Sequence, residues 1–230
     1  MPDATIGILA GMGPRSTGPF VDLVVSACQT MFGARHDIDF PRMLICSQPA
    51  PFYEDRTIDH AALESATLSG LKCLQFAGVD FIGIACNTVH IYYPRLAREL
   101  QVPLLNIVEL AAMQTKQRKG KVAIVAARPT VESNIYQRAI TAHETEVVDL
   151  CWQDDVDRLL SAVRETTDPA VFQALWKPIT AKASSAGLRS IVLACLDLSG
   201  VAKYWEPEIP IVDAADCLAQ ELVRQWLARR

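Results

Sequence analysis

The sequence predicts an α/β fold made of two similar parallel-sheet domains that are related by a pseudo-twofold axis. Short apolar segments alternate with helix-forming segments along the chain, which is typical of βαβ units and a parallel sheet. Three segments of the first half also return, in the same order, in the second half. Half of the 230 residues are hydrophobic and 21% are charged, so the chain can bury a sizeable core.

The predicted strands are short apolar segments bounded by polar or turn-forming residues. A helix is predicted over His60–Ala77, because its apolar residues, among them Leu63 and Leu71, follow helical spacing. The eight predicted strands are Thr5–Ala10, Arg42–Ser47, Phe81–Cys86, Leu104–Asn106, Lys121–Ala126, Thr145–Asp149, Ser190–Cys195 and Ile211–Asp213.

The internal repeat predicts two homologous halves. Between the two copies of the three segments, the offset changes from 116 to 109 to 107 residues, as loops of different length would produce. This period is too long for a solenoid. The paired segments are Thr5–Ala10 with Lys121–Ala126, Gly78–Cys86 with Gly187–Cys195, and Val102–Asn106 with Ile209–Asp213.

The repeat also predicts where the domains divide and where a ligand binds. We expect one domain over residues 1–103 together with a C-terminal helix at about 214–230, and a second over 104–213. Cys86 and Cys195 end equivalent strands, and open α/β sheets bind ligands beyond the carboxyl ends of their strands. If the halves face each other, both thiols reach one site in the cleft between the domains, with sulfurs roughly 7 Å apart around a substrate carbon.

Composition excludes several classes of protein. A net charge of −4 offers no general attraction for nucleic acid or an anionic membrane. No apolar run approaches the ~18 residues of a membrane span, and the start lacks the basic region of a secretory signal. The seven cysteines show neither C-x-x-C nor a metal-binding His/Cys spacing, which indicates a reduced, cytoplasmic chain without a metal site. Five of them are interpreted as small hydrophobic residues, namely Cys28, Cys46, Cys73, Cys151 and Cys217.

Polar residues follow Cys86, whereas two leucines follow Cys195. Asn87 and Thr88 follow Cys86, where backbone N–H groups and a helix dipole can lower a thiol pKa or hold a carboxylate. The alternative is a buried cysteine in a polar loop. Leu196 and Leu198 make a core cysteine the stronger alternative for Cys195, and its equivalence to Cys86 is the reason to assign it a function.

With these motifs the sequence resembles the aspartate/glutamate racemase superfamily, and within it the aspartate racemase branch, over essentially the whole chain. Gly7–Pro14 is similar to the opening loop of that branch, which usually reads Gly-Gly-Met-Gly-Pro. Cys86-Asn87-Thr88 with His90 resembles its first cysteine motif. The second motif normally reads Cys-Thr-Glu or Cys-Thr-Asp; here Asp197 keeps the acid, but Leu196 replaces the threonine.

The resemblance implies a racemase that works without a cofactor. One cysteine, as thiolate, removes the α-proton of an amino acid, and the other, as thiol, returns a proton to the opposite face. Backbone donors near Met12 and Gly13, near Asn87 and Thr88, and near Leu196 would hold the α-carboxylate as it gains charge. The expected partners are a small acidic amino acid and a second copy of the chain in a homodimer.

Two arginines are candidates for the distal carboxylate of aspartate or glutamate. Asp55-Arg56-Thr57 is similar to a segment of the family whose arginine grips that group, and Gln48–Tyr53 fits a lid. Arg164 falls where the branch often has a lysine with the same role, and an arginine there can bind a carboxylate bidentately. For each, the alternative is a solvated surface charge. Arg15–Thr17 is a weaker candidate for substrate contact.

Three alternative functions stay open. The first is a related isomerase of the maleate or hydantoin type, or a decarboxylase; two cysteines disfavour the decarboxylase, and Arg56 disfavours a hydantoin substrate. The second is a Rossmann oxidoreductase, although Gly7, Gly11 and Gly13 do not match G-x-G-x-x-G. The third is a degenerate protein that binds an acidic ligand without converting it, for which Leu196 is the support.

Overall fold

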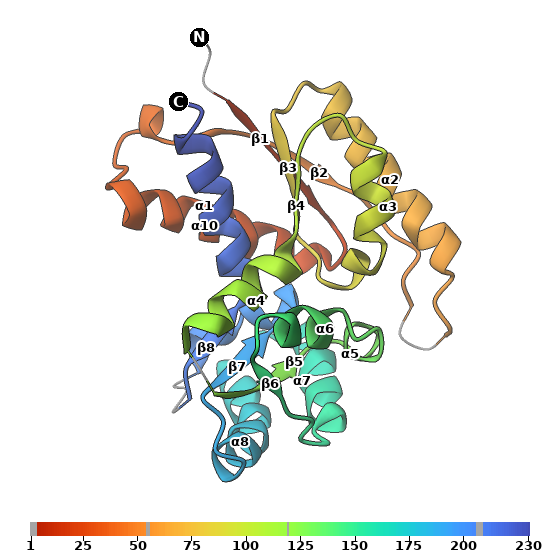
Figure 1. Cartoon of the computed structure of the whole chain (residues 1–230), viewed down its shortest axis with the longest axis vertical. Helices are drawn as coiled ribbons and strands as arrows, with labels where there is room; N and C mark the ends of the chain where they lie inside the picture. The colour runs from red at the N-terminus through yellow and green to blue at the C-terminus, as the bar shows by residue number, and fades with distance from the viewer. Residues whose placement is uncertain (1–3, 54–55, 119, 206–208) are drawn as a thin grey trace. The chain divides into compact units, whose positions relative to one another are not determined.

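A computed structural model describes residues 4–53, 56–118, 120–205 and 209–230 (Figure 1). In these residues the strands form two parallel sheets of four strands each, in the orders β2-β1-β3-β4 and β6-β5-β7-β8. The predicted α/β class is therefore confirmed. The chain divides into two compact units: unit 1 is Met1–Ile107 with Leu218–Arg230, and unit 2 is Val108–Cys217.

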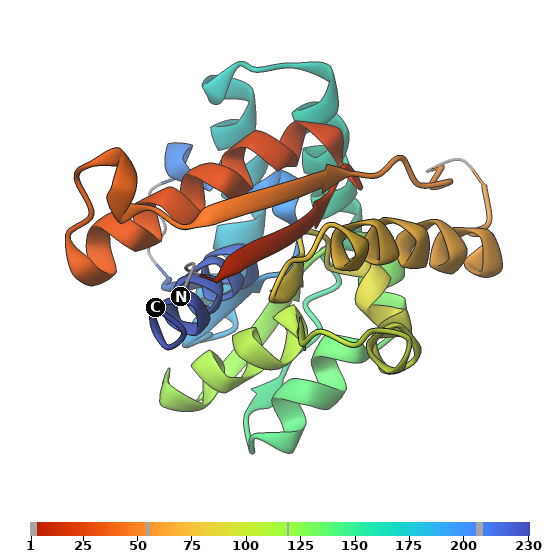
Figure 2. The same ribbon diagram turned by 90° about the horizontal axis from the view of Figure 1, so that it is seen from above.

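Unit 1 is a sheet covered by helices on both faces. Leu63 and Leu71 of α2 pack with Leu96 of α3 in a core on one face. On the other face α10 approaches so closely that a Cβ added to Gly83 would lie 3.2 Å from Leu222, and Figure 2 shows α10 and α2 on either side of β1. The elements are β1 (Thr5–Ala10), α1 (Thr17–Phe32), β2 (Arg42–Ser47), α2 (His60–Phe76), β3 (Phe81–Ile84), α3 (Tyr93–Arg98), β4 (Leu104–Leu105) and α10 (Ala214–Leu227), with 3-10 helices η1 (Pro14–Ser16), η2 (Asp37–Asp39) and η3 (Thr88–Tyr92).

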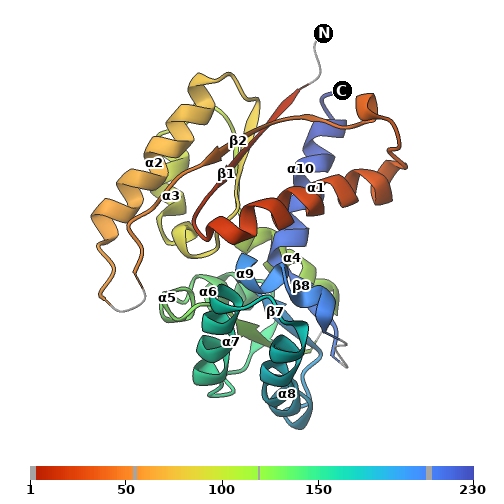
Figure 3. The ribbon, with the colours of Figure 1, turned by 180° about the vertical axis from the view of Figure 1, so that it is seen from behind.

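Unit 2 repeats this architecture. Trp176 of α8 stacks on Trp205 at 3.9 Å between ring centroids, in a core that α7 and α8 form against β5 and β7. Figures 1 and 3 show α7 and α8 on one face of this sheet and α4 and α6 on the other. The elements are α4 (Ile107–Arg118), β5 (Lys121–Val125), α5 (Arg128–Glu132), α6 (Ile135–Ala142), β6 (Glu146–Val147), α7 (Gln153–Glu165), α8 (Pro169–Ser185), β7 (Ser190–Leu193), α9 (Leu196–Ser199), η4 (Ala202–Tyr204) and β8 (Ile211–Asp213).

The internal repeat extends to the pairing of individual residues. In each sheet the first strand of the repeat, β1 or β5, is an inner strand that pairs with the third, β3 or β7. Adding the sequence offsets of 116 and 109 to a residue pair between β1 and β3 gives a residue pair between β5 and β7. The same holds between the third and fourth strands. Equivalent pairs are Leu9–Ile84 with Val125–Leu193, and Gly83–Leu105 with Val192–Val212.

Two predicted strands are too long at the ends that carry the cysteines. The strands end at Ile84 and Leu193, not at Cys86 and Cys195. Ala85 and Ala194 still donate a backbone hydrogen bond to the neighbouring central strand, at 2.8 Å in both halves. Beyond that bond the chain leaves the sheet, so each cysteine lies in a connecting loop. Among the described residues, no helix combines the length and the apolar character required to cross a membrane.

Candidate active site

In unit 1 three loops meet at the carboxyl edge of the sheet. Because β1, β2 and β3 are parallel, the residues that follow them lie at one edge. Gln48, after β2, donates its N–H to Ala10 of β1 at 2.9 Å, and Ala85, after β3, donates to Leu9 at 2.8 Å. The edge therefore gathers the opening loop, the start of the predicted lid and the loop that carries Cys86.

The opening loop depends on glycine at two positions. Gly11 and Gly13 have φ angles of +91° and +88°, which side chains other than hydrogen rarely permit. The side chain of Met12 packs toward the core, where its sulfur accepts the Thr67 hydroxyl at 3.8 Å. The Met12 side chain is therefore not the group predicted to bind a carboxylate, and that prediction concerns the backbone N–H groups of Met12 and Gly13.

Gly11→Ala is expected to disrupt this loop. A Cβ at Gly11 would lie 2.7 Å from the Gln48 nitrogen, and this neighbour is backbone that cannot rotate away. Together with the strained φ, we expect a loss of about 1–3 kcal/mol of unfolding free energy. Chemical denaturation measures it. Gly18→Ala is the control, because a Cβ there meets nothing within 4 Å; equal stability of both variants would contradict the expectation.

His90 fixes the loop that carries the half-buried Cys86. Its Nε2 accepts the backbone N–H of Ile107 at 3.4 Å, so the ring proton is on Nδ1, which donates to the Cys86 carbonyl at 2.8 Å. Burial lowers the pKa of His90 to about 4, so the ring is neutral near pH 7. Because it bonds the Cys86 backbone, His90 orients the loop as a neutral group, and it stacks on Tyr93 with 5.9 Å between ring centroids.

Asn87 and Thr88 follow Cys86 directly, as the sequence motif requires. Asn87 is buried, with 3% of its surface exposed, and occupies the N-cap position of the 3-10 helix η3, whose first residue is Thr88, without a capping hydrogen bond from its side chain. Both therefore lie beyond the carboxyl end of β3, near the opening loop of the same sheet.

Arg56 is exposed and lies between β2 and α2. Its guanidinium carbon lies 4.5 Å from the centroid of the Tyr53 ring, a cation–π contact. Asp55, the predicted neighbour in the motif, lies outside the described residues. At the end of this segment His60 Nδ1 lies 2.7 Å from the Tyr92 hydroxyl, which connects the start of α2 to η3.

In unit 2 Cys195 occupies the equivalent position. It is half-buried and occupies the N-cap position of the short helix α9, without a capping hydrogen bond from its side chain. Its carbonyl accepts the N–H groups of Leu198 and Ser199, both at 3.1 Å. Leu196, the first residue of α9, is buried, with 6% of its surface exposed. The leucine that departs from the motif, next to Cys195 in sequence, therefore has its side chain in the protein interior.

Arg164 lies near the acidic residue of the second cysteine motif. Its Nη2 is 3.8 Å from an Asp197 carboxylate oxygen, and the Arg164 side chain is 38% exposed. The distance is at the long end of an ion pair, and the exposure leaves the guanidinium accessible to solvent. The structure therefore brings together Cys195, Leu196 and Arg164 in unit 2, as it brings together Met12, Gly13, Cys86, Asn87 and Thr88 in unit 1.

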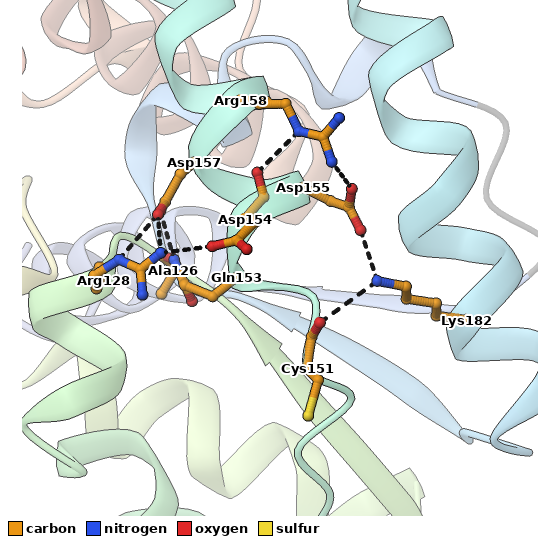
Figure 4. Close-up of polar contacts among 9 residues, drawn as sticks. All are labelled: Ala126, Arg128, Cys151, Gln153, Asp154, Asp155, Asp157, Arg158 and Lys182. Carbon is orange, nitrogen blue, oxygen red and sulfur yellow. Dashed lines mark hydrogen bonds and ion pairs between the residues drawn. The ribbon is translucent and has the colours of Figure 1, made fainter.

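A network of charges holds the helix that carries Arg164 (Figure 4). Arg128, which follows β5, bonds to Asp157 at 2.5 Å and to Asp154 at 3.0 Å, both in the first turns of α7. Asp155 accepts Lys182 of α8 at 2.8 Å, and this ammonium lowers the pKa of Asp155. These contacts fix α7 at its N-terminal end, while Arg164 lies near the other end.

The carboxyl edge of the second sheet also contains Asp213, which sequence reasoning did not single out as a site residue. The Ser199 hydroxyl lies 2.7 Å from Asp213 Oδ1 and 3.2 Å from the Cys195 carbonyl. The repeat held the signal, because it pairs Asp213 with Asn106 at the end of an apolar strand. Among the described residues, no cluster of three or more His, Cys, Asp or Glu side chains is placed to hold a metal ion.

Comparison with known proteins decides the family. The model of the Asp/Glu/Hydantoin racemase family matches residues 9–222, which include both cysteine loops and most of the chain. The chain belongs to this family. It is 41% identical over 224 residues to the "Broad specificity amino-acid racemase RacX" of Bacillus subtilis, which covers 97% of this chain and 98% of that protein.

Solved structures agree with this assignment. An aspartate racemase from Picrophilus torridus superposes with a TM-score of 0.80 at 26% identity, over 99% of this chain and 95% of that one. An aspartate racemase homologue from Pyrococcus horikoshii has the same fold, with a TM-score of 0.79 at 19% identity over 97% and 99% of the two chains. The protein is thus an amino-acid racemase of the Asp/Glu racemase family, an isomerase, as the sequence resemblance implied.

Proposed function

We propose that this racemase acts on aspartate and/or glutamate by two-base proton transfer at Cα between Cys86 and Cys195, with no cofactor. The supporting observation is the equivalence of the two thiols. Each lies two residues beyond the third strand of its sheet, after the same backbone hydrogen bond, in halves with the same register. A pair of equivalent groups is what a reaction between mirror-image substrates requires.

In the proposed step one cysteine is a thiolate and the other a thiol. The thiolate takes the α-proton and becomes a thiol, while the electron pair of the broken C–H bond moves toward the α-carboxylate. The second cysteine gives its proton to the opposite face of Cα and becomes a thiolate. Atoms and charge balance, and the enzyme ends in the protonation state that starts the reverse reaction.

The charge that develops on the α-carboxylate requires donors in fixed positions. We assign this role to the backbone of Met12 and Gly13, of Asn87 and Thr88, and of Leu196. The position of these residues supports this assignment. Within its own unit, each of them follows the carboxyl end of an inner strand of the sheet. Arg56 and Arg164 are assigned to the side-chain carboxylate.

Proton exchange tests the proposal directly. The protein is incubated in D₂O with L- and D-aspartate and with L- and D-glutamate, and deuterium at Cα is followed by NMR together with the enantiomer ratio. We expect both exchange and inversion for at least one acidic amino acid. Tight binding of these ligands with neither exchange nor inversion would identify the degenerate binding protein instead.

Arg56→Ala is expected to remove selectivity for an acidic side chain. Loss of a charged partner for the distal carboxylate should lower kcat/KM for aspartate or glutamate by about tenfold to a hundredfold, since a hydrogen bond to a charged group contributes about 1.5–3 kcal/mol. Turnover of alanine should change far less. Arg56→Lys is the matched control that keeps the charge; equal losses on all substrates would instead assign Arg56 to structure.

A second candidate is a racemase with a wider range of amino acids. It is favoured by the Bacillus subtilis relative at 41% identity, whose name states broad specificity. Inversion of a panel of neutral, basic and acidic amino acids separates the two candidates.

We also propose, from the sequence resemblance, that the enzyme works as a cytoplasmic homodimer. Light scattering on the purified protein tests its oligomeric state.

A further inference from the structure

Behind each cysteine the fold places a polar side chain four residues further along, with equivalent partners. His90 bonds the Cys86 carbonyl and the backbone of Ile107, the first residue of α4. Ser199 lies 3.2 Å from the Cys195 carbonyl and 2.7 Å from Asp213, which ends β8. Each side chain thus connects a cysteine loop to the carboxyl end of the outer strand of its sheet, at the last strand residue in unit 2 and just beyond the strand in unit 1.

The two connections differ in how their protons are fixed. His90 donates its ring proton from Nδ1 to the Cys86 carbonyl while Nε2 accepts the N–H of Ile107, and the Leu105 backbone is a further hydrogen-bonding neighbour of the ring. The Ser199 hydroxyl has one proton and two acceptors, the Cys195 carbonyl and Asp213. Asp213 Oδ1 also accepts the N–H of Ala215 at 2.9 Å, which holds the carboxyl group in place.

We propose that Ser199 and Asp213 are positioning residues of Cys195, and that protonation of Asp213 switches the Ser199 hydroxyl between two acceptors. When Asp213 is ionised, Ser199 donates to the carboxylate. When Asp213 is neutral, its carboxyl proton is donated to Ser199 Oγ, and the Ser199 proton is donated to the Cys195 carbonyl. The reactivity of the Cys195 thiol then depends on Asp213. This inference rests on the proposed role of Cys195 as a proton carrier.

The burial of Asp213 and the groups around it place the pKa of its carboxyl group in the physiological range. Burial raises the pKa of Asp213 to about 6, and the hydrogen bonds from Ser199 and Ala215 oppose that effect. Asp216 of α10 raises it further by like-charge repulsion. Cys217 stays neutral, because burial raises its pKa to about 12, with Arg118 acting weakly in the opposite direction.

The sign of the effect follows from the charge. Above pH 6 the ionised Asp213 adds negative charge to the surroundings of Cys195 and withdraws a donor from its carbonyl. Both changes disfavour the Cys195 thiolate. His90 remains neutral across this range because its pKa is about 4, so we expect Cys86 to show no such transition.

The rate at which each cysteine is alkylated measures the expected difference in pH dependence between Cys86 and Cys195, and it does so independently of catalytic activity. The protein is treated with iodoacetamide between pH 5 and pH 9, and modification of the Cys86 and Cys195 peptides is measured by mass spectrometry in the same samples. We expect the logarithm of the Cys195 rate to flatten near pH 6 and then rise again. In Asp213→Asn the flattening disappears, and Cys195 reacts about three- to tenfold faster at pH 7.5, the effect of roughly half to one pKa unit.

The variants separate positioning from structural damage. Asparagine keeps an oxygen for Ser199 and Ala215 but does not titrate. Ser199→Ala removes the hydroxyl but leaves the charge of Asp213, so it should shrink the transition to its electrostatic part, and Ser199→Thr, which keeps the hydroxyl, should restore the full transition. A Cys195 profile without a break, a break that persists in Asp213→Asn, or equal changes at Cys86 would each overturn the proposal. Racemisation that survives in Cys195→Ala would refute the proposed function alone, because the alkylation result does not depend on it.

Discussion

Replacing Cys86 or Cys195 by alanine is expected to lower racemisation about a thousandfold or more, because either change leaves one face of Cα without a proton carrier. Chiral chromatography of L- and D-aspartate and of L- and D-glutamate measures the loss. Cys73→Ala is the matched control, since Cys73 is exposed on α2 and lies outside the proposed site. Circular dichroism shows whether each variant keeps its fold.

The alanine variants carry a further diagnostic. The surviving thiolate can still remove and return a proton on its own face, so each variant is expected to exchange the α-proton of one enantiomer in D₂O without inverting it. Cys86→Ala and Cys195→Ala should select opposite enantiomers. Full racemase activity in either variant would disprove the two-base mechanism, and exchange of the same enantiomer by both would show that the thiols do not address opposite faces.

Leu196→Thr is expected to raise turnover of aspartate or glutamate about tenfold or more. The threonine of the family motif offers a hydroxyl where charge develops, and a missing donor at such a site costs about 2.7–4 kcal/mol, or two to three orders of magnitude in rate. Leu196 is buried, and its apolar side chain also disfavours a nearby charge by desolvation. Steady-state kcat and KM on both amino acids, with the melting temperature as a check of stability, measure the effect.

Leu196→Val is the control for this substitution. Valine has the shape of threonine without its hydroxyl, so a gain in threonine alone identifies the hydroxyl as the cause. A gain in both variants would identify the bulk of leucine. If neither variant gains and the original protein is already fast, the backbone N–H of residue 196 suffices and the departure from the motif is neutral.

The fold could be predicted from the sequence because its signals are local and repeated. β1, β2 and β8 have their predicted bounds, and the repeat of short apolar segments predicted two similar parallel sheets, although it did not predict the order of their strands. The ends of β3 and β7 were wrong by two residues. Apolar character continues through Ala85 and Ala194, but where a strand leaves its sheet depends on the neighbouring strand, which a local pattern does not contain.

The site residues were predicted from their types and spacing, while their partners were not. The motif that includes His90 does not reveal that its ring bonds a backbone carbonyl, since this depends on Ile107, 17 residues away. The approach of Arg164 to Asp197 links residues on two helices, α7 and α9. Ser199 and Asp213 are 14 residues apart and meet because β7 and β8 pair with Leu193 opposite Asp213, so that the helix following β7 begins beside the end of β8.

The course of the chain through α10 has a consequence for biosynthesis. Unit 1 is discontinuous, since Leu218 and Leu222 of α10 cover Gly83 only after all of unit 2 has been translated. Unit 2 is a single stretch of chain, so all of it is available for folding once it has left the ribosome. The ribosome adds about 5–20 residues per second. Until α10 emerges, the nascent chain exposes the apolar face of its first sheet. The time for which this face stays uncovered by α10 is therefore set by the time taken to translate the second unit.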